Sequence, residues 1–177
     1  MGLPNDDSRG ARLRLVEEHV QLENAHDLGR LMQTFGNQAA YDDEPWDDHR
    51  RGRDAVKDYY ESLLAAIPDL QIEITNRHVA ECAVIIEVII TGTHLGAWRG
   101  LPATGRRLRF PLCGLYTFDS NDRLAGERIY YDRAGVMRQL GLFYDPGTQL
   151  GRVMSGLTHP VTLTRAYGRK LFRVAAA

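Results

Sequence analysis

A carboxylate at the end of a predicted strand is the residue best suited to chemistry in this sequence. Asp132 ends the predicted strand 123–132, and strand alternation places it on one face with Arg128 and Tyr130. An apolar pocket would raise the pKa of Asp132, because burial disfavours the charged carboxylate. A carboxyl group tuned in this way can take a proton from a carbon next to a carbonyl and later return it. Asp132 either has this role or caps the predicted helix 133–140, and we favour the pocket.

The two neighbours on that face would affect the chemistry in opposite ways. Tyr130 can donate a hydrogen bond to an enolate oxygen, unless it is a packing residue. Arg128 close to Asp132 would oppose the rise of its pKa, which limits how deeply the pair can be buried. We predict that both residues belong to the substrate pocket.

A long glycine-rich segment, residues 92–106, carries the second candidate. It joins two predicted strands and contains four glycines and a proline, which suggests a functional loop rather than a tight turn. His94, at its start, would steer a substrate carbonyl or act as a second acid or base, or it only anchors the loop. Trp98, further along, lines the pocket or packs in the core.

Two more residues are weaker candidates for the pocket. Asn24 lies at the end of the apolar face of the first predicted helix, where it either looks into a cavity or simply ends the helix. Trp46 follows Pro45 in the acidic stretch 42–49, which we interpret as a solvated loop. Trp46 could still stand at the rim of a pocket.

The histidines and cysteines give no metal signature. Cys82 and Cys113 form no Cys-x-x-Cys motif, and the remaining histidines have no ligand spacing. We therefore expect no metal site, and thiols that stay reduced.

The periodicity of apolar residues predicts helices first and strands afterwards. Helical spacing covers residues 11–23, 28–35 and 52–67. Period-two alternation covers 70–75, 83–93, 108–118 and 123–132, with a short weak strand at 38–43. Short connections imply an antiparallel meander, and so an α+β fold with the helices on one face. Residues 1–10 are expected to be disordered, and residues 143–177 to form a C-terminal helical extension.

The composition is that of an ordinary soluble globular domain. The 177 residues are 44% hydrophobic and 25% charged, with a formal net charge of −1, so no basic surface is expected for nucleic acid. The longest apolar run, 84–90, contains Glu87 and is too short to cross a membrane. The polar start of the chain shows no signal peptide, and we expect a cytoplasmic protein.

Four motifs together resemble the SnoaL-like polyketide cyclases of the nuclear transport factor 2-like superfamily. They are the pattern Gly-Thr-His-x-Gly-x-x-x-Gly-x-Pro-x-Thr-Gly-Arg at 92–106, Asp132 ahead of Gln139-Leu140-Gly141, the pair Asn24 and Asp27, and Gly52–Val56. The resemblance covers residues 11–142. It implies a cone-shaped, curved antiparallel sheet that the N-terminal helices wrap around an apolar pocket.

The resemblance also implies an activity. These cyclases close a ring of an aromatic polyketide by intramolecular aldol condensation, without a cofactor or a metal, and their catalytic aspartate falls on Asp132. Relatives often form homodimers through the outer face of the sheet, where Ile85 and Ile89 would lie. The chain from Tyr144 onward lies outside the family pattern.

Two other functions stay open from the sequence. The same fold can serve as a non-catalytic binding protein for a small apolar molecule, or as a related hydrolase or hydroxylase. An epoxide hydrolase of this fold needs an Arg-x-Asp pair on a strand. The four long predicted strands lack that pair, which counts against this activity.

Overall fold

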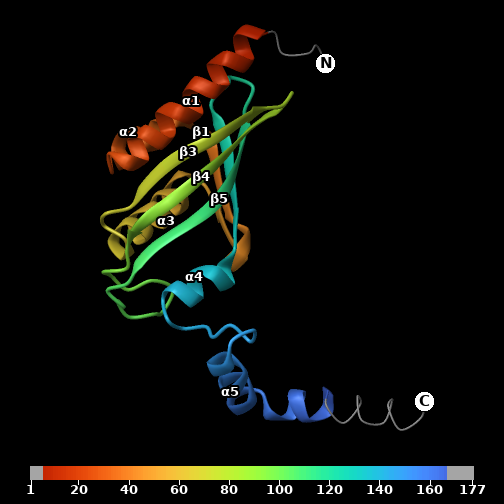
Figure 1. Ribbon diagram of the computed structural model, residues 1–177. Helices are drawn as coiled ribbons and strands as arrows, with labels where there is room; N and C mark the ends of the chain where they lie inside the picture. The colour runs from red at the N-terminus through yellow and green to blue at the C-terminus, as the bar shows by residue number, and fades with distance from the viewer. Residues whose placement is uncertain (1–5, 167–177) are drawn as a thin grey trace, which may run out of the picture. The chain divides into compact units, whose positions relative to one another are not determined.

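The computed structural model describes residues 6–166 and divides into two units, Met1–Leu140 and Gly141–Ala177. The first unit contains α1 (Asp6–Asn24), α2 (Leu28–Thr34), β1 (Phe35–Asp43), the 3-10 helix η1 (Glu44–Trp46), β2 (Asp48–Arg51), α3 (Arg53–Ala66), β3 (Gln71–Val79), β4 (Ala83–Thr93), β5 (Arg107–Phe118), β6 (Leu124–Tyr131) and α4 (Arg133–Gln139) (Figure 1). The predicted α+β class is confirmed.

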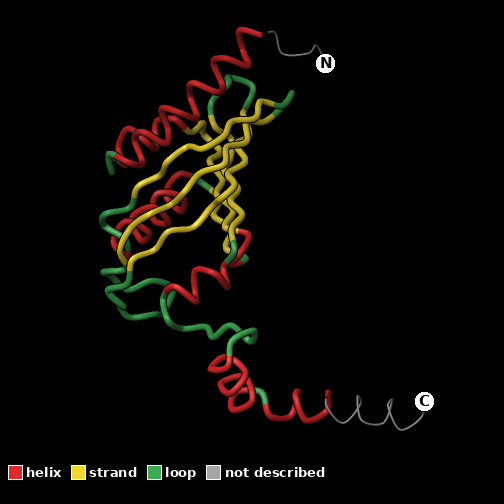
Figure 2. Tube along the Cα trace, in the orientation of Figure 1, coloured by secondary structure: helices red, strands yellow, loops and turns green. Residues whose placement is uncertain are grey.

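The six strands form one curved sheet in the order β2-β1-β6-β5-β4-β3 (Figure 2). The predicted antiparallel meander accounts for β3 to β6. The sheet is nevertheless mixed, because β1 pairs with β6 in parallel, and β2 then pairs with β1 in antiparallel fashion. The alternation of residues along the chain does not show that β1 and β6, so far apart in sequence, are neighbours.

The concave face of the sheet holds the core. Residues paired across an antiparallel ladder share a face, so Tyr116 opposite Glu127 and Leu112 opposite Tyr131 all point to the same side. The helices α1 and α3 cover that side with their apolar faces, through Val16 and other residues that are fully buried. Ile85 and Ile89 on β4 are half-exposed and lie on the outer face of the sheet, the face on which the sequence placed them.

Two predicted segments differ from the structure. The acidic stretch 42–49 is not a solvated loop: Asp42 and Asp43 end β1 and are buried, with 5% and 0% of their surface exposed. Their charges are tolerated there because arginine side chains reach both carboxylates. The helix α1 begins at Asp6, inside the stretch 1–10 that was expected to be disordered, and residues 1–5 lie outside the described part.

The glycine-rich segment between β4 and β5 is anchored on α3. The N–H groups of Leu95 and Gly96 donate to the carbonyl oxygen of Ala66 at 2.9 and 3.0 Å. A Cβ on Gly96 would lie 2.1 Å from the carbonyl oxygen of Ala65, so this close approach requires glycine. Arg99 and Gly100 then both adopt positive φ angles of 49° and 80°, as the centre of a tight turn requires.

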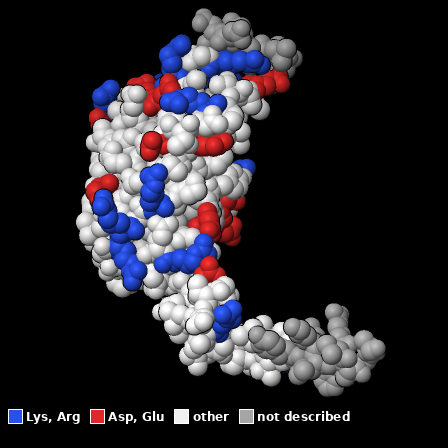
Figure 3. All heavy atoms as spheres, in the orientation of Figure 1, with Lys and Arg blue, Asp and Glu red and all other residues white. Residues whose placement is uncertain are grey.

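The second unit contains α5 (Gln149–Thr158), which the sequence predicted, and further helical residues at 160–166. The hydroxyl of Thr148 accepts a hydrogen bond from the N–H of Gly151 and so caps the start of α5. Residues 167–177 of the predicted C-terminal helical extension lie outside the described residues. Among residues 6–166, the helices are all too short or too polar to cross a lipid bilayer. Basic and acidic side chains are interspersed on the face drawn in Figure 3.

Candidate functional site

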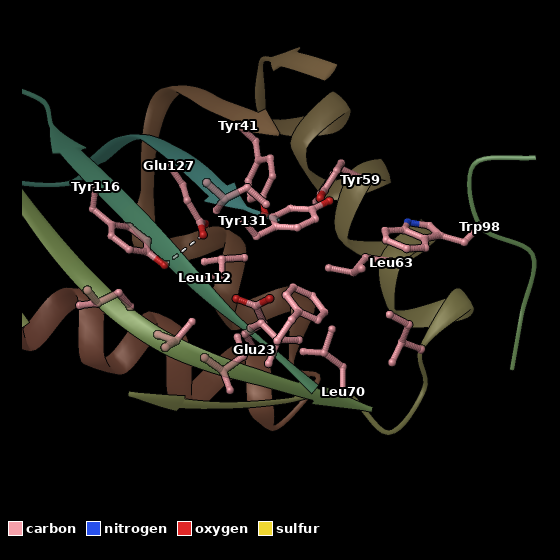
Figure 4. Close-up of a pocket in the computed structure, with 17 residues that line it drawn as sticks. Glu23, Tyr41, Tyr59, Leu63, Leu70, Trp98, Leu112, Tyr116, Glu127 and Tyr131 are labelled. Carbon is pink, nitrogen blue, oxygen red and sulfur yellow. Dashed lines mark hydrogen bonds between the residues drawn. The ribbon is translucent and has the colours of Figure 1, made fainter. Parts of the chain in front are cut away.

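An apolar cavity lies between the concave face of the sheet and the helices α1 and α3 (Figure 4). The centre of a water molecule can occupy about 50 Å³ of it, which is room for a few waters. Most of the walls are aliphatic or aromatic, and two carboxyl groups interrupt them. The lining residues are Glu23, Tyr41, Tyr59, Leu63, Ile67, Leu70, Ile72, Ile86, Val88, Ile90, Trp98, Phe110, Leu112, Tyr116, Glu127, Ile129 and Tyr131.

Glu127 is the most strongly hydrogen-bonded group in the cavity wall. It stands on β6 with 5% of its surface exposed. Its Oε1 accepts a hydrogen bond from the hydroxyl of Tyr116 at 3.0 Å, and its Oε2 accepts one from Tyr60 at 2.6 Å. Two accepted hydrogen bonds, one on each oxygen, are the arrangement expected of an ionised carboxylate.

A buried histidine stands behind this carboxylate. His19 is fully buried on α1, and its Nε2 lies 3.1 Å from the Tyr60 hydroxyl and 3.4 Å from Oε2 of Glu127. Its Nδ1 lies 2.7 Å from the hydroxyl of Thr34, which itself donates to the carbonyl of Leu31. Thr34 has thus used its proton, so His19 Nδ1 must carry the hydrogen of their bond.

The second carboxyl group, Glu23, is in a different environment. It comes from the last turn of α1 and has 5% of its surface exposed. Burial raises the pKa of Glu23 well above its usual range, and the nearby charge of Glu127 raises it further. Within residues 6–166, no hydrogen bond holds its carboxyl group. Glu23 is therefore suited to be the protonated partner of an ionised Glu127, a division of roles that supports acid and base chemistry.

A third carboxylate, Asp43, lies behind the cavity wall and affects two of its tyrosines. Asp43, fully buried, accepts a hydrogen bond from Tyr59 at 3.0 Å and pairs with Arg99 at 2.5 Å. Burial raises the pKa of Asp43 even though Arg99 opposes the shift. Burial and the charge of Asp43 also raise the pKa of Tyr131. Tyr131 therefore stays protonated and can act as a hydrogen-bond donor, whereas Tyr59 already donates its proton to Asp43.

The predicted face of β6 points away from the cavity. Asp132 has 60% of its side chain exposed and pairs with Arg138 at 3.1 Å. The N–H of Gly135 at the start of α4, together with Arg138, lowers the pKa of Asp132. Tyr130 is 45% exposed, and Arg128 pairs on the surface with Asp42 and Glu44. The pocket prediction for these residues was wrong, because the alternate residues of the strand point inward.

The other predicted residues divide between the cavity and its surroundings. Trp98 lines the cavity as predicted. Asn24 does not: its side-chain amide bonds the backbone of Ile72 at 2.9 and 2.7 Å and so joins α1 to β3. His94 is fully buried but anchors the loop, with Nδ1 3.0 Å from the hydroxyl of Thr104. Trp46 stands outside the cavity, with its ring centroid 5.7 Å from that of Trp98.

The sequence contained a signal for the residues that it missed. Val16, Val20 and Glu23 follow one another at helical spacing, so Glu23 continues the buried face that Asn24 was thought to end. Glu127 could be found from the register alone, since it lies opposite the buried Tyr116.

One cluster in the described part of the chain has the composition of a metal site. Oxygen and nitrogen atoms of Asp42, Glu44 and His49 lie within 4.8 Å of one another. Arg51 and Arg128 already pair with Asp42, at 2.6 and 3.3 Å. Although burial opposes the shift, bonds from Arg51 and His49 lower the pKa of Asp42. The cluster is therefore an ion-pair network whose positive charges would repel a cation.

Solved structures show the same fold at low sequence identity. A candidate polyketide cyclase from Xanthomonas campestris matches with a TM-score of 0.69 and 16% identity over 75% of this chain and 98% of its own. SalBIII, an epoxide hydrolase/cyclase-like enzyme of pyran ring formation in the polyether salinomycin, matches with a TM-score of 0.62 and 19% identity. The match covers 71% of this chain and 94% of SalBIII. A protein with a ketosteroid isomerase-like fold from Catenulispora acidiphila matches with a TM-score of 0.61 and 20% identity. The match covers 72% of this chain and 94% of that protein.

The sequence comparisons give one family. No curated protein matches the chain. The family model of the SnoaL-like polyketide cyclases matches residues 13–140, which is nearly the whole first unit and most of the chain. That span includes most of α1, the helices α2 to α4, every strand and all the residues that line the cavity. The chain therefore belongs to the SnoaL-like polyketide cyclase family.

Proposed function

We propose that this protein is a cofactor-independent enzyme of the cyclase or isomerase type, which moves a proton at the carbon next to a carbonyl. The observation that carries the proposal is the pair of buried carboxyl groups, Glu23 and Glu127, facing one apolar cavity from different environments. The family supports ring closure of a polyketide-like compound as the reaction. The acid and base role expected of Asp132 passes to Glu127 and Glu23.

The proposed reaction is an intramolecular aldol addition. Glu127 takes a proton from the α-carbon, and the enolate carbon then attacks a second carbonyl carbon of the same molecule to form the new C–C bond. The resulting alkoxide takes the proton back from Glu127, so the product is an isomer of the substrate. The protonated Glu23 and the hydroxyl of Tyr131 donate hydrogen bonds to the enolate oxygen while it is charged.

Exchange of α-protons tests the proposal without knowledge of the natural substrate. A cyclic aryl ketone such as 1-tetralone is incubated in D₂O, and loss of its α-proton signal is followed by NMR. We expect the protein to accelerate exchange over buffer by about 10²-fold or more, the usual contribution of a positioned base. Glu127→Gln should abolish the acceleration, and Glu23→Gln should reduce it.

Asp132→Asn is the matched control, because Asp132 directly follows the strand that carries Glu127 but has an exposed carboxylate. It should leave the exchange rate unchanged. Folding of every variant is checked by circular dichroism, and Glu23→Gln keeps the test informative if Glu127→Gln is unstable. Exchange that survives in both glutamine variants, or that disappears in Asp132→Asn, would refute the assignment.

A non-catalytic binding protein would use the same cavity. It would bind the ketone and be stabilised by it, but would not exchange its α-protons.

Homodimerisation stays a prediction, which sedimentation of wild type and of an Ile89→Lys variant on the outer sheet face would test.

A further inference from the structure

A second, larger hollow adjoins the inner cavity in the first unit. By the same measure its volume is about 370 Å³. It is lined by Trp46, Asp48, Arg50, Tyr59, Ser62, Leu63, Ala97, Trp98 and Arg99. Three of these residues, Tyr59, Leu63 and Trp98, also line the inner cavity. The two spaces are therefore separated by a wall that is one side chain thick.

Among the described residues, no side-chain hydrogen bond holds the other two parts of this wall, Leu63 and Trp98. Figure 4 shows them at the end of the cavity opposite Tyr116, whereas Tyr59 is held by its hydrogen bond to Asp43. Leu63 is half-buried, and Trp98 sits in the tight turn of the loop between β4 and β5. The inner cavity holds only a few waters, so a ring-sized ligand can enter it only if this wall opens.

The outer hollow differs chemically from the inner cavity. Its lining side chains carry two positive charges and one negative charge, from Arg50, Arg99 and Asp48. Arg50 binds Asp48 through Nε and Nη2, at 2.6 and 3.0 Å, with 41% of its side chain exposed. Arg99 binds Asp43 and Asp48 through its two Nη atoms, and its buried Nε has no partner in the described residues. Nη1 of Arg50 and Nε of Arg99 are therefore left as hydrogen-bond donors beside the rings of Trp46 and Trp98.

We propose that the outer hollow is a second subsite, which binds the carboxylate end of an elongated aromatic ligand. The hydroxyl or carbonyl end of that ligand enters the inner cavity past Leu63 and Trp98. Trp46 and Trp98 contact the middle of the ring system, and Arg50 binds the carboxylate. The inference rests on the inner cavity being the ligand site of the proposed function, and it adds the length and charge of the ligand.

Two probes that share one ring system test the subsite by calorimetry of the full chain. 2-Naphthol carries only the hydroxyl group, whereas 6-hydroxy-2-naphthoate adds a carboxylate at the far end. We expect the naphthoate to bind about tenfold more tightly, as a charge-assisted hydrogen bond allows. Arg50→Gln should remove most of that advantage and leave the affinity for 2-naphthol unchanged.

The wall has a matched pair of variants on α3. Leu63→Ala should speed association of both probes, whereas Leu64→Ala, a neighbouring half-buried leucine that lines neither space, should not. Equal affinities for the two probes, or an equal loss of both in Arg50→Gln, would overturn the subsite.

The outcomes also separate this inference from the proposed function. If 2-naphthol binds and Glu127→Gln weakens it, but the carboxylate adds nothing, only the outer subsite fails. If neither probe binds at millimolar concentration, the inner cavity is not the ligand site, and both proposals fail.

Discussion

Removal of a single hydroxyl group tests whether the network around Glu127 is as tightly bonded as the structure shows. Tyr60 is fully buried, and its hydroxyl bonds both Oε2 of Glu127 and Nε2 of His19. In Tyr60→Phe, a buried charged oxygen loses its 2.6 Å donor, and the ring of His19 loses a partner. A hydrogen bond to a charged group contributes about 1.5–3 kcal/mol, and a buried charged oxygen left without its donor lies at the upper end of that range.

The expected loss of unfolding free energy is therefore about 3 kcal/mol. For a chain of this length, that corresponds to a fall in Tm of about 6–12 °C. Urea unfolding followed by tryptophan fluorescence measures it, because Trp46 and Trp98, the chain's two tryptophans, both belong to the first unit. The double variant with Glu127→Gln should show a coupling of about 1–3 kcal/mol, since the two side chains are in contact.

Tyr130→Phe is the matched control for this measurement. It removes the same hydroxyl from a tyrosine that is 45% exposed, so stability should stay within about 0.5 kcal/mol of wild type. If Tyr60→Phe and Tyr130→Phe were equally stable, or the coupling to Glu127 were absent, the reasoning about this network would be refuted.

Two further predictions concern Glu23 and the loop. Because burial raises the pKa of Glu23, its stabilising contribution is complete below about pH 4.3, the unfolded pKa, and is lost as the pH rises through the native pKa. Glu23→Gln should thus match wild type at pH 4 and be more stable at pH 8 by chemical denaturation, whereas Glu18→Gln, at an exposed site on the same helix, should show no such difference. Gly96→Ala should lower stability by about 1–3 kcal/mol, because its methyl group meets the carbonyl oxygen of Ala65. Gly29→Ala on α2 meets ordinary contacts and should be neutral or slightly stabilising, so equal effects at the two glycines would contradict the close approach.

Periodicity predicted most of the first unit correctly. The helical faces and the strands β3 to β6 each follow one clear repeat, and their short connections fix a meander. β2 was missed because Asp48 and its neighbours are charged, and charged residues are rare in strands unless ion pairs hold them. Asp48 is held by Arg50 and Arg99.

The face of β6 that lines the cavity could not be chosen by alternation alone. Alternation shows that Glu127, Ile129 and Tyr131 share a face, but not that this face points inward. Asp132 at the strand end then led us to predict that the opposite face, with Arg128 and Tyr130, lines the pocket. The burial of Tyr116 on the neighbouring strand decides the matter, since paired residues share a face.

The parallel pairing of β1 with β6 makes the site a late product of the chain. Asp42 and Arg128, which bond across this pair, are 86 residues apart in sequence. The hairpins from β3 to β6 close locally, whereas β1 pairs with the last strand of the sheet to be synthesised. Tyr41 on β1 and Glu127 on β6 face the same cavity. A nascent chain that has reached β5 therefore has most of the sheet, but it lacks the strand that carries Glu127 and completes the wall. Closure of the cavity and completion of the sheet thus depend on the same strand.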